Sequence, residues 1–442
     1  MPLRFVDKSQ TPNTISSLTE LQFIDTEEGR CFRLFDASGN EARVEYVPQF
    51  VSNWSHDRYD IFLFENPYLT AENDIFELYE PSLGDNRLGW IFPITALDSN
   101  DHNYADHKYF KHYRFVAYWK ILELDLQTVQ QEGKSDFKIS ELIPNVCVCL
   151  LSKEEISKLS GFKIEDYAIS FLKFDYLLYQ GKPKGIAVFD KSDFIQALRK
   201  GNHKLTIKKA AYNISHDGYT KSLFIDHLYQ SENFLVKYVL LYQIIEYFIQ
   251  EIGDAELDEI IKSYQNRSIN KNRLKEKIAR FHNDRSLIKK VFEKTDINKE
   301  TKKIFIEKCE YLFGDIGEEI EGGFENIIYD FRNLVTHRYR VVSTKTTDLK
   351  NIILLFESVI IELILNYNQR NVTDNEEQLP IATSTNKSVE PPSGNNEPKN
   401  PFKLISDSFK TNWSRIKKAI SIFKLRTHIA WPSMQPTSKA SQ

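Results

Sequence analysis

The stretch SENFLVKYVLLYQIIEYFIQEIGD, residues 231–254, decides the fold class of the second half of the chain. Apolar side chains occupy most of the circumference over more than about five helical turns, which predicts a long and mostly buried helix. Ser231 is the expected N-cap, and Gly253 marks the expected end of the helix. Because a helix that is apolar on nearly every side must be surrounded by other helices, the sequence predicts a bundle.

The residues that follow support the same prediction up to about residue 370. This interval contains no proline, and charged and apolar residues alternate in it at helical spacing. Further helices are expected in ELDEIIKSYQN, NKNRLKEKIARFHND, KETKKIFIEKCEYLF, FENIIYDFRNLVTHRYR and TTDLKNIILLFESVIIELILNYNQ. The helical bundle is therefore expected to span residues 228–370.

Residues 1–215 have a different sequence pattern, which predicts a strand-rich, mixed domain. Short apolar and aromatic runs alternate with turn signals, and CFRLFDASGNEARVEYV favours a hairpin around its Ser-Gly-Asn turn. The expected strands include DIFLFENPYL, NVCVCLL and KGIAVFD, and the expected helices include KEEISKL and SDFIQALRK. The predicted fold class is α+β and multidomain, with this strand-rich domain preceding the all-α bundle.

The C-terminal part contains two segments of different composition and sequence pattern. Residues 371–400 are rich in Pro, Ser, Asn and Glu, which predicts a disordered linker. Residues 401–426 predict a basic amphipathic helix, because apolar residues recur at three- and four-residue spacing: Phe402, Ile405, Phe409, Trp413, Ile416, Ile420 and Phe423. Three roles stay open for it: docking onto the bundle or a partner, contact with a membrane surface through residues 402–425, and RNA binding.

Composition limits the class of protein. With 442 residues, 41% of them hydrophobic and 27% charged, the chain is long enough for several folded domains. A net charge of -4 argues against coating nucleic acid by bulk charge. The four cysteines lack CxxC spacing, and Cys147 and Cys149 are expected core residues of one strand face. No secretion signal or membrane-spanning run of about 18 apolar residues is visible, so a cytoplasmic location is expected.

The segment FRNLVTHRYR, residues 331–340, carries the candidate functional residues. At about 100° per residue, the apolar residues of this expected helix share one face: Ile327, Ile328, Phe331, Leu334 and Val335. Arg332, Asn333 and His337 lie on the opposite arc and point away from the core. Asn333 and His337 are neighbours at i and i+4, whereas Arg332 reaches the same place only by extending its long side chain. A merely solvated helix face predicts the same orientation.

This arrangement resembles the HEPN superfamily, whose hallmark is an Arg, a polar residue that is often Asn, and a His a few residues later, within a compact helical bundle. RNLVTH matches the hallmark at Arg332, Asn333 and His337, and the resemblance covers residues 228–370. IIEYF is similar to the family's first core helix, which commonly carries an acidic residue near the site. Glu246 stands at that place.

The resemblance implies a metal-independent endoribonuclease without a cofactor, active as a homodimer with two motif copies in one cleft. Such cleavage needs a group that activates the RNA 2′-OH and a group that stabilises charge on the phosphate. His337 suits the first task because histidine titrates near neutral pH, and Arg332 suits the second because its planar cation braces phosphate. Asn333 would orient His337 or donate to phosphate. Arg338 and Arg340 would contact phosphate or complement the helix C-terminus.

HEPN nucleases fused to partner domains are commonly toxins or effectors of antiviral defence and abortive infection. The resemblance therefore implies an RNA-cleaving effector that is regulated by residues 1–215, with a trigger or regulator protein bound by that domain. The alternative is a catalytically inactive HEPN-type module for dimerisation and protein binding.

A second group of polar residues lies in DHNYADHKYFKHYRF. His102, His107 and His112 follow one another at five-residue intervals, with Asp101 and Asp106 nearby. Five-residue spacing aligns ligands on neither a helix nor a strand, so an exposed loop is expected rather than a metal site. Motifs typical of nucleotide hydrolysis, dinucleotide binding, serine hydrolysis and zinc proteolysis do not occur.

Overall fold

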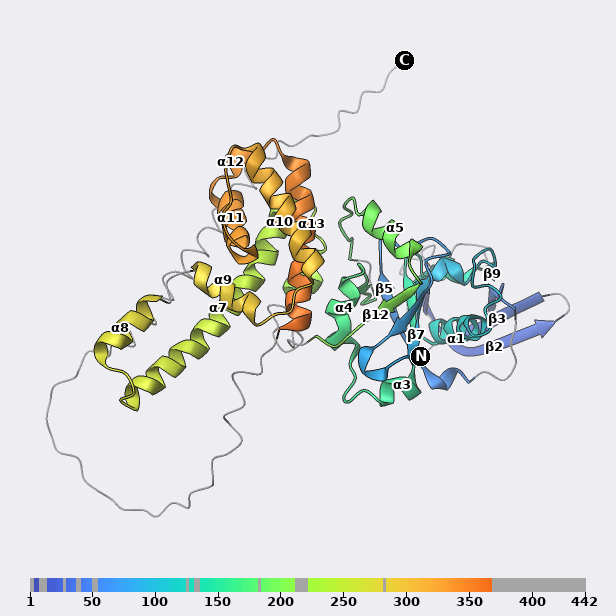
Figure 1. The fold of residues 1–442 in the computed structure, drawn as a ribbon. Helices are drawn as coiled ribbons and strands as arrows, with labels where there is room; N and C mark the ends of the chain where they lie inside the picture. Colours follow the sequence, from blue (N-terminus) through green and yellow to red (C-terminus); the bar gives the residue numbers. More distant parts are fainter. Residues whose placement is uncertain are drawn as a thin grey trace, which may run out of the picture. The chain divides into compact units, whose positions relative to one another are not determined.

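The computed structural model describes residues 4–7, 14–26, 29–36, 41–49, 55–124, 127–130, 136–181, 184–210, 222–280 and 284–367. The expected linker, residues 371–400, and the expected basic helix, residues 401–426, lie outside these ranges and stay predictions. Within the described ranges, no helix combines the length and the apolarity needed to cross a membrane. The strand-rich first half and the helical second half are confirmed (Figure 1).

The first sheet contains the predicted hairpin. Its strand order is β8-β1-β2-β3-β4-β9. The strands are β1 (Arg4–Asp7), β2 (Thr14–Thr26), β3 (Gly29–Asp36), β4 (Glu41–Glu45), β8 (Gln127–Gln130) and β9 (Asp136–Phe137). β3 and β4 pair antiparallel with Phe32 opposite Val44 and Leu34 opposite Ala42. All four of these side chains are buried, which is the period-two pattern of a sheet with one core face.

The second sheet has the order β11-β5-β10-β7-β6-β12. Its strands are β5 (Tyr59–Glu65), β6 (Phe76–Tyr79), β7 (Arg87–Pro93), β10 (Cys147–Ser152), β11 (Leu177–Leu178) and β12 (Lys204–Thr206). Val148 and Leu150 of β10 join one hydrophobic cluster, whereas Cys147 and Cys149 join another. Because both faces of β10 are covered, its sequence is continuously apolar instead of alternating. Cys147 and Cys149 are buried, as predicted.

Helices of the first half cover the sheets. They are α1 (Phe110–Glu123), α2 (Ile139–Leu142), α3 (Lys153–Ser157), α4 (Ala168–Leu172) and α5 (Ser192–Lys200). The prediction of a strand in KGIAVFD was wrong, because residues 184–191 form no regular element. Their backbone instead bonds to neighbouring elements: the Ala187 N–H donates to the carbonyl of Tyr229, and the Phe189 N–H donates to the hydroxyl of Tyr68.

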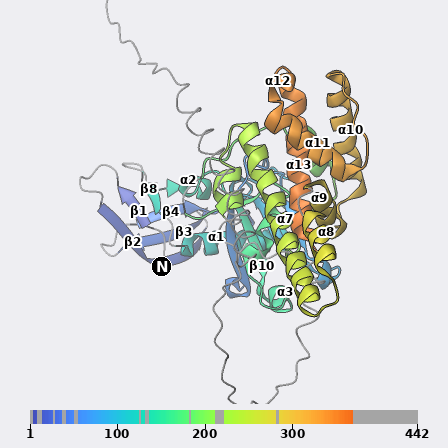
Figure 2. The same cartoon turned by 90° about the vertical axis from the view of Figure 1, so that its left-hand side faces the viewer.

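The second half begins with a π-helical turn, Leu223–Leu228, and continues as a helical bundle. Its helices are α7 (Phe234–Gln265), α8 (Lys271–Arg280), α9 (Asp284–Glu293), α10 (Lys299–Asp315), α11 (Phe324–His337), α12 (Tyr339–Val342) and α13 (Thr346–Asn366). α7 packs against α9 and α13, and α11 packs against α9 and α10. Figures 1 and 2 both show α8 beside the C-terminal half of α7.

The predicted ends of the first long helix were wrong. Asn233 caps α7 instead of Ser231, since its side-chain oxygen accepts hydrogen bonds from the backbone of Leu235 and Val236 at 2.9 and 3.3 Å. The helix also passes through Gly253 and takes in ELDEIIKSYQ. A single glycine costs a helix interior only about 1 kcal/mol, and no proline follows to stop it.

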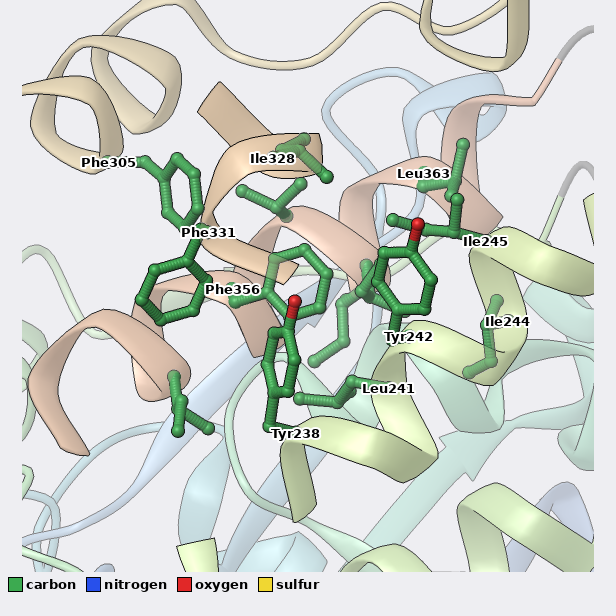
Figure 3. Close-up of a cluster of buried hydrophobic side chains, with 14 of the residues drawn as sticks. Tyr238, Leu241, Tyr242, Ile244, Ile245, Phe305, Ile328, Phe331, Phe356 and Leu363 are labelled. Atoms are coloured by element: carbon green, nitrogen blue, oxygen red, sulfur yellow. The ribbon is translucent and has the colours of Figure 1, made fainter. Parts of the chain in front are cut away.

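The helical half and part of the first half share one hydrophobic core, although two further clusters belong to the first half alone. Ile169 and Leu172 of α4 and Leu177 of β11 belong to the same buried cluster as α7, α10, α11 and α13. α4 packs directly against α13. Figure 3 shows the centre of this core, where Tyr238 and Tyr242 project from α7 side by side. Residues on either side of the expected boundary between 215 and 228 therefore belong to one hydrophobic cluster.

Three buried charged side chains and one partly buried lysine, Lys191, lie where the halves meet, and we call them the buried charge cluster: Asp175, Lys191, Lys237 and Glu357. Lys237 and Glu357 are each 2% exposed, and their charged groups lie 2.9 Å apart. The ammonium group of Lys191 pairs with Asp175 and lies 3.5 Å from Glu357. Burial would raise the pKa of Glu357, but Lys191 and Lys237 outweigh it and hold the pKa below its ordinary value.

Candidate active site

The helix α11 has the two faces that its sequence predicts. The apolar residues of the predicted core face are all buried: Ile327, Ile328, Phe331, Leu334 and Val335. Thr336 and His337 are exposed, while Arg332 and Asn333 are partly buried. The polar residues of α11 therefore line the edge of the bundle where it meets solvent.

Arg332, Asn333 and His337 converge, and we call these three residues the α11 site. The Nη1 group of Arg332 donates a hydrogen bond to Oδ1 of Asn333 at 3.0 Å. The same Nη1 lies 3.3 Å from Nε2 of His337. An Arg N–H can donate to this ring nitrogen only when the nitrogen carries no proton, as in a neutral imidazole with its hydrogen on Nδ1.

The helix α7 supplies the inner wall of this site. The guanidinium carbon of Arg332 lies 5.7 Å from the ring centroid of Tyr242, a cation–π distance. The Glu246 carboxyl, one turn further along α7, also interacts with Arg332. Burial raises the pKa of Glu246, Arg332 lowers it in part, and Asp284 raises it further. Glu246 thus lies within electrostatic reach of Arg332, as its place in the sequence suggested.

The other two predicted arginines differ from each other. Arg338 follows the last residue of α11 and directs both terminal nitrogens at the carboxylate of Glu318, with one contact of 2.9 Å. The hydrogen bonds from Arg338 hold the pKa of Glu318 below its ordinary value. Arg340 lies in α12, is exposed, and forms no ion pair with any residue that the structure describes. Of the two, only Arg340 has a guanidinium group without an acidic partner in that part of the chain.

Tyr242 lies beside Arg332, and Asp284 interacts with Tyr242 and Glu246, but neither residue was predicted. Tyr242 looks like one more core aromatic of an apolar helix, and 93% of its surface is indeed buried. Its spacing of four residues from Glu246 is the one sequence signal that places it beside the site. Asp284 begins α9, which is not among the helices expected from the sequence.

The histidine-rich segment forms no metal site in the described part of the chain. The prediction of an exposed loop was wrong for His102, which is 4% exposed, and for His112, which is partly buried in α1. Burial, together with the charge of Arg114, lowers the pKa of His102 to about 4. Arg114 pins the loop by donating to the carbonyl of Leu97 at 2.9 Å. Nδ1 of His107 accepts from the Phe110 N–H at 3.3 Å, so this side chain supports the start of α1.

The α11 site combines a permanent cation, an imidazole and an amide within one patch open to solvent. Arg332 forms no ion pair within 4 Å among the residues with described positions, so its charge is available to an anionic ligand. The imidazole beside it can accept or donate a proton. A search of protein-family models, curated proteins and solved structures finds no match to this chain.

Proposed function

We propose that this chain is a HEPN-type, metal-independent endoribonuclease that acts as a homodimer. The observation that carries the proposal is the 3.3 Å contact between Nη1 of Arg332 and Nε2 of His337 on the solvent side of α11. Attack of a hydroxyl on the adjacent phosphate requires a cation near the phosphate oxygens and a proton acceptor near the hydroxyl, so the two protein groups must lie close together. RNA carries that hydroxyl at each 2′ position.

The proposed reaction uses the groups of two protomers. When RNA binds, Nη1 of Arg332 turns from Nε2 of His337 to the phosphate, so that Nε2 of one His337 accepts the proton of the RNA 2′-OH while the 2′ oxygen bonds to the adjacent phosphorus. The bond from phosphorus to the 5′ oxygen breaks, and His337 of the second protomer in its protonated form gives that oxygen a proton. Arg332 neutralises charge on the non-bridging oxygens, and Asn333 keeps the guanidinium and the imidazole aligned. The products carry a 2′,3′-cyclic phosphate and a free 5′-OH.

The biological setting belongs to the same proposal. The chain would work in the cytoplasm as a defence or toxin effector, with the strand-rich half regulating cleavage. The shared core supports direct communication between the halves, because α4 and β11 contribute side chains to the cluster that also holds α11.

The test compares three purified variants on single-stranded RNA in EDTA: Arg332→Ala, His337→Ala and Lys303→Ala. The first two should lose cleavage by about 10²–10⁴-fold, as removal of a charge stabiliser or a general base typically does. Lys303 is the matched control, since it is a cation on the exposed side of α10 whose partner, Glu307, is 3.9 Å away. Its loss should leave cleavage unchanged.

Mass spectrometry of the products should find the 2′,3′-cyclic phosphate. Equal activity in wild type, Arg332→Ala and His337→Ala would reject the nuclease. Absence of RNA cleavage in the wild type, together with a stable dimer, would favour the non-enzymatic dimerisation and binding module instead. An active monomer would reject the shared cleft.

A further inference from the structure

The contact between Arg332 and His337 runs against the normal direction of helical side chains. The Cα–Cβ bonds of an α-helix tilt toward its N-terminus, so His337 naturally covers the preceding turn, where Asn333 lies. Arg332 must extend the other way, toward the C-terminus, to reach Nε2 of His337 at 3.3 Å. A long flexible side chain has many rotamers, and most of them point elsewhere. Asn333 of α11 accepts from the same Nη1 at 3.0 Å, and a contact from outside α11 would restrict the side chain further.

The neighbouring surface of α7 offers such a restraint. The guanidinium carbon of Arg332 lies 5.7 Å from the centroid of the Tyr242 ring. Tyr242 is 7% exposed and lies 6.1 Å from the ring of Tyr238, which in turn meets Phe331 edge-on at 5.3 Å. Figure 3 shows Tyr238 and Tyr242 side by side in this packed layer. The Tyr242 ring is therefore fixed by the core while Arg332 lies at its surface.

We propose that Tyr242 is a positioning residue whose ring holds the guanidinium of Arg332 against Asn333 and His337. Its role in cleavage rests on the proposed function, whereas its role in orienting Arg332 does not. The face of an aromatic ring carries partial negative charge and attracts a cation without neutralising it, in contrast to a carboxylate. Arg332 can thus be restrained and still bind phosphate.

Tyr242 and Glu246 act on the Arg332 guanidinium in different ways. Glu246 attracts Arg332 by its charge, and an attraction of this kind has little directional preference. The ring confines the guanidinium to one side of a rigid surface. If the ring rather than the hydroxyl is responsible, phenylalanine should replace Tyr242 and leucine should not.

The test of orientation is the ¹⁵N-arginine NMR spectrum of Tyr242→Phe, Tyr242→Leu and Phe248→Leu in the full chain. Phe248 is the matched control, since it is a buried aromatic residue of α7 that packs on Tyr367 at 4.3 Å. The Nε–Hε signal of Arg332, assigned with Arg332→Lys, should shift and broaden in Tyr242→Leu. It should stay in place in Tyr242→Phe and Phe248→Leu. An unchanged signal in folded Tyr242→Leu would overturn the proposal.

The test of catalysis separates this inference from the nuclease itself. Tyr242→Leu should lower kcat for RNA cleavage about tenfold with little change in KM, because a misplaced Arg332 is felt mainly in the transition state. Tyr242→Phe should restore kcat. If the wild type cleaves RNA and Tyr242→Leu has the same kcat, the positioning role fails and the nuclease stands. If the wild type is inert but the NMR signal moves as expected, the orientation stands and the nuclease fails.

Discussion

The buried charge cluster includes Lys237 of α7, and the α11 site lies against Tyr242 of the same helix, yet only the second group is open to solvent. Glu357 is 2% exposed and lies between two lysines, whereas His337 is exposed and has Arg332 as its neighbour. In the first group each charge is matched by an opposite charge. In the second, a cation and an imidazole stand together without a carboxylate in ion-pair contact among the described residues.

This difference separates polar residues that hold a structure together from polar residues that can serve a ligand. A buried charge is stable only when other groups of the protein pair with it or hydrogen-bond to it. A charge that is paired in this way is not available to bind a ligand. An exposed cation is satisfied by water, which a phosphate can replace. The comparison therefore predicts large effects on stability in one group and small effects in the other.

The largest effect is expected from Glu357→Ala. This change leaves the ammonium group of Lys237 buried without its carboxylate, which typically costs about 3–5 kcal/mol of unfolding free energy. Urea unfolding followed by circular dichroism measures the loss. Ser358→Ala, the next residue and an exposed one, should change stability by less than about 0.5 kcal/mol. Equal losses would show that the cluster is not a distinct source of stability.

A smaller effect is expected when both partners are replaced. Lys237→Met and Glu357→Leu together remove both buried charges and fill similar volume, while Asp175 and Lys191 keep each other. The double variant should be more stable than the sum of the single losses predicts, by about 1–3 kcal/mol. A double-mutant cycle from denaturant unfolding gives this coupling. Strict additivity would contradict the paired arrangement.

On α11 the stability effect of removing a site residue should be smaller still. His337→Ala should change the unfolding free energy by less than about 0.5 kcal/mol, because the imidazole is exposed. Leu334→Ala, three residues earlier and 1% exposed, should lose about 2–5 kcal/mol. Thermal unfolding of the two variants distinguishes them. A large loss in His337→Ala would assign His337 to the structure instead of the site.

The smallest effect concerns Glu246 and depends on pH. Burial raises its folded pKa, so the carboxyl binds protons more tightly in the folded protein than in the unfolded chain. Its contribution to stability is then greatest below the unfolded pKa and is lost as pH rises through the folded pKa. Glu246→Gln should gain stability relative to the wild type as pH rises from 4 to 8.

Unfolding curves at several pH values measure that trend. The same comparison in an Arg332→Ala background is the control, because Arg332 lowers the pKa of Glu246 and its removal should steepen the dependence. A relative stability of Glu246→Gln that falls with pH would contradict the assignment.

Local patterns predicted the elements whose burial follows one period. The face of α11 came directly from residue spacing, and the uninterrupted apolar run of β10 was recognisable as a strand. The hairpin of β3 and β4 followed from its turn residues. These features depend on residues within a few positions of one another, so they can be predicted from local sequence patterns.

Tertiary packing decided the rest. Gly253 reads as a stop, yet α7 continues because its C-terminal half packs against α8 and α9. Residues 184–191 look like a strand, but their N–H groups bond to Tyr229 and Tyr68 from other elements. In each case the competing interaction comes from another element, so the pattern within the segment itself does not record it.

The candidate site likewise has a part that local spacing predicted and a part that depends on tertiary packing. The spacing of Arg332, Asn333 and His337 on one helix could be read from the sequence, although their convergence required the structure. Tyr242 was not assigned, because its one sequence signal is a spacing of four residues from Glu246 and its partner, Arg332, stands far along the chain.

The shared core limits how the two halves can be exchanged during evolution. Since Ile169, Leu172 and Leu177 pack into the cluster that holds α7 and α13, the first half is bound to the second by its own interior. A bundle released from its neighbour would expose that apolar surface and self-associate. Exchange of the strand-rich half for another would succeed only if the incoming half matched this surface, so the two halves are expected to be inherited together.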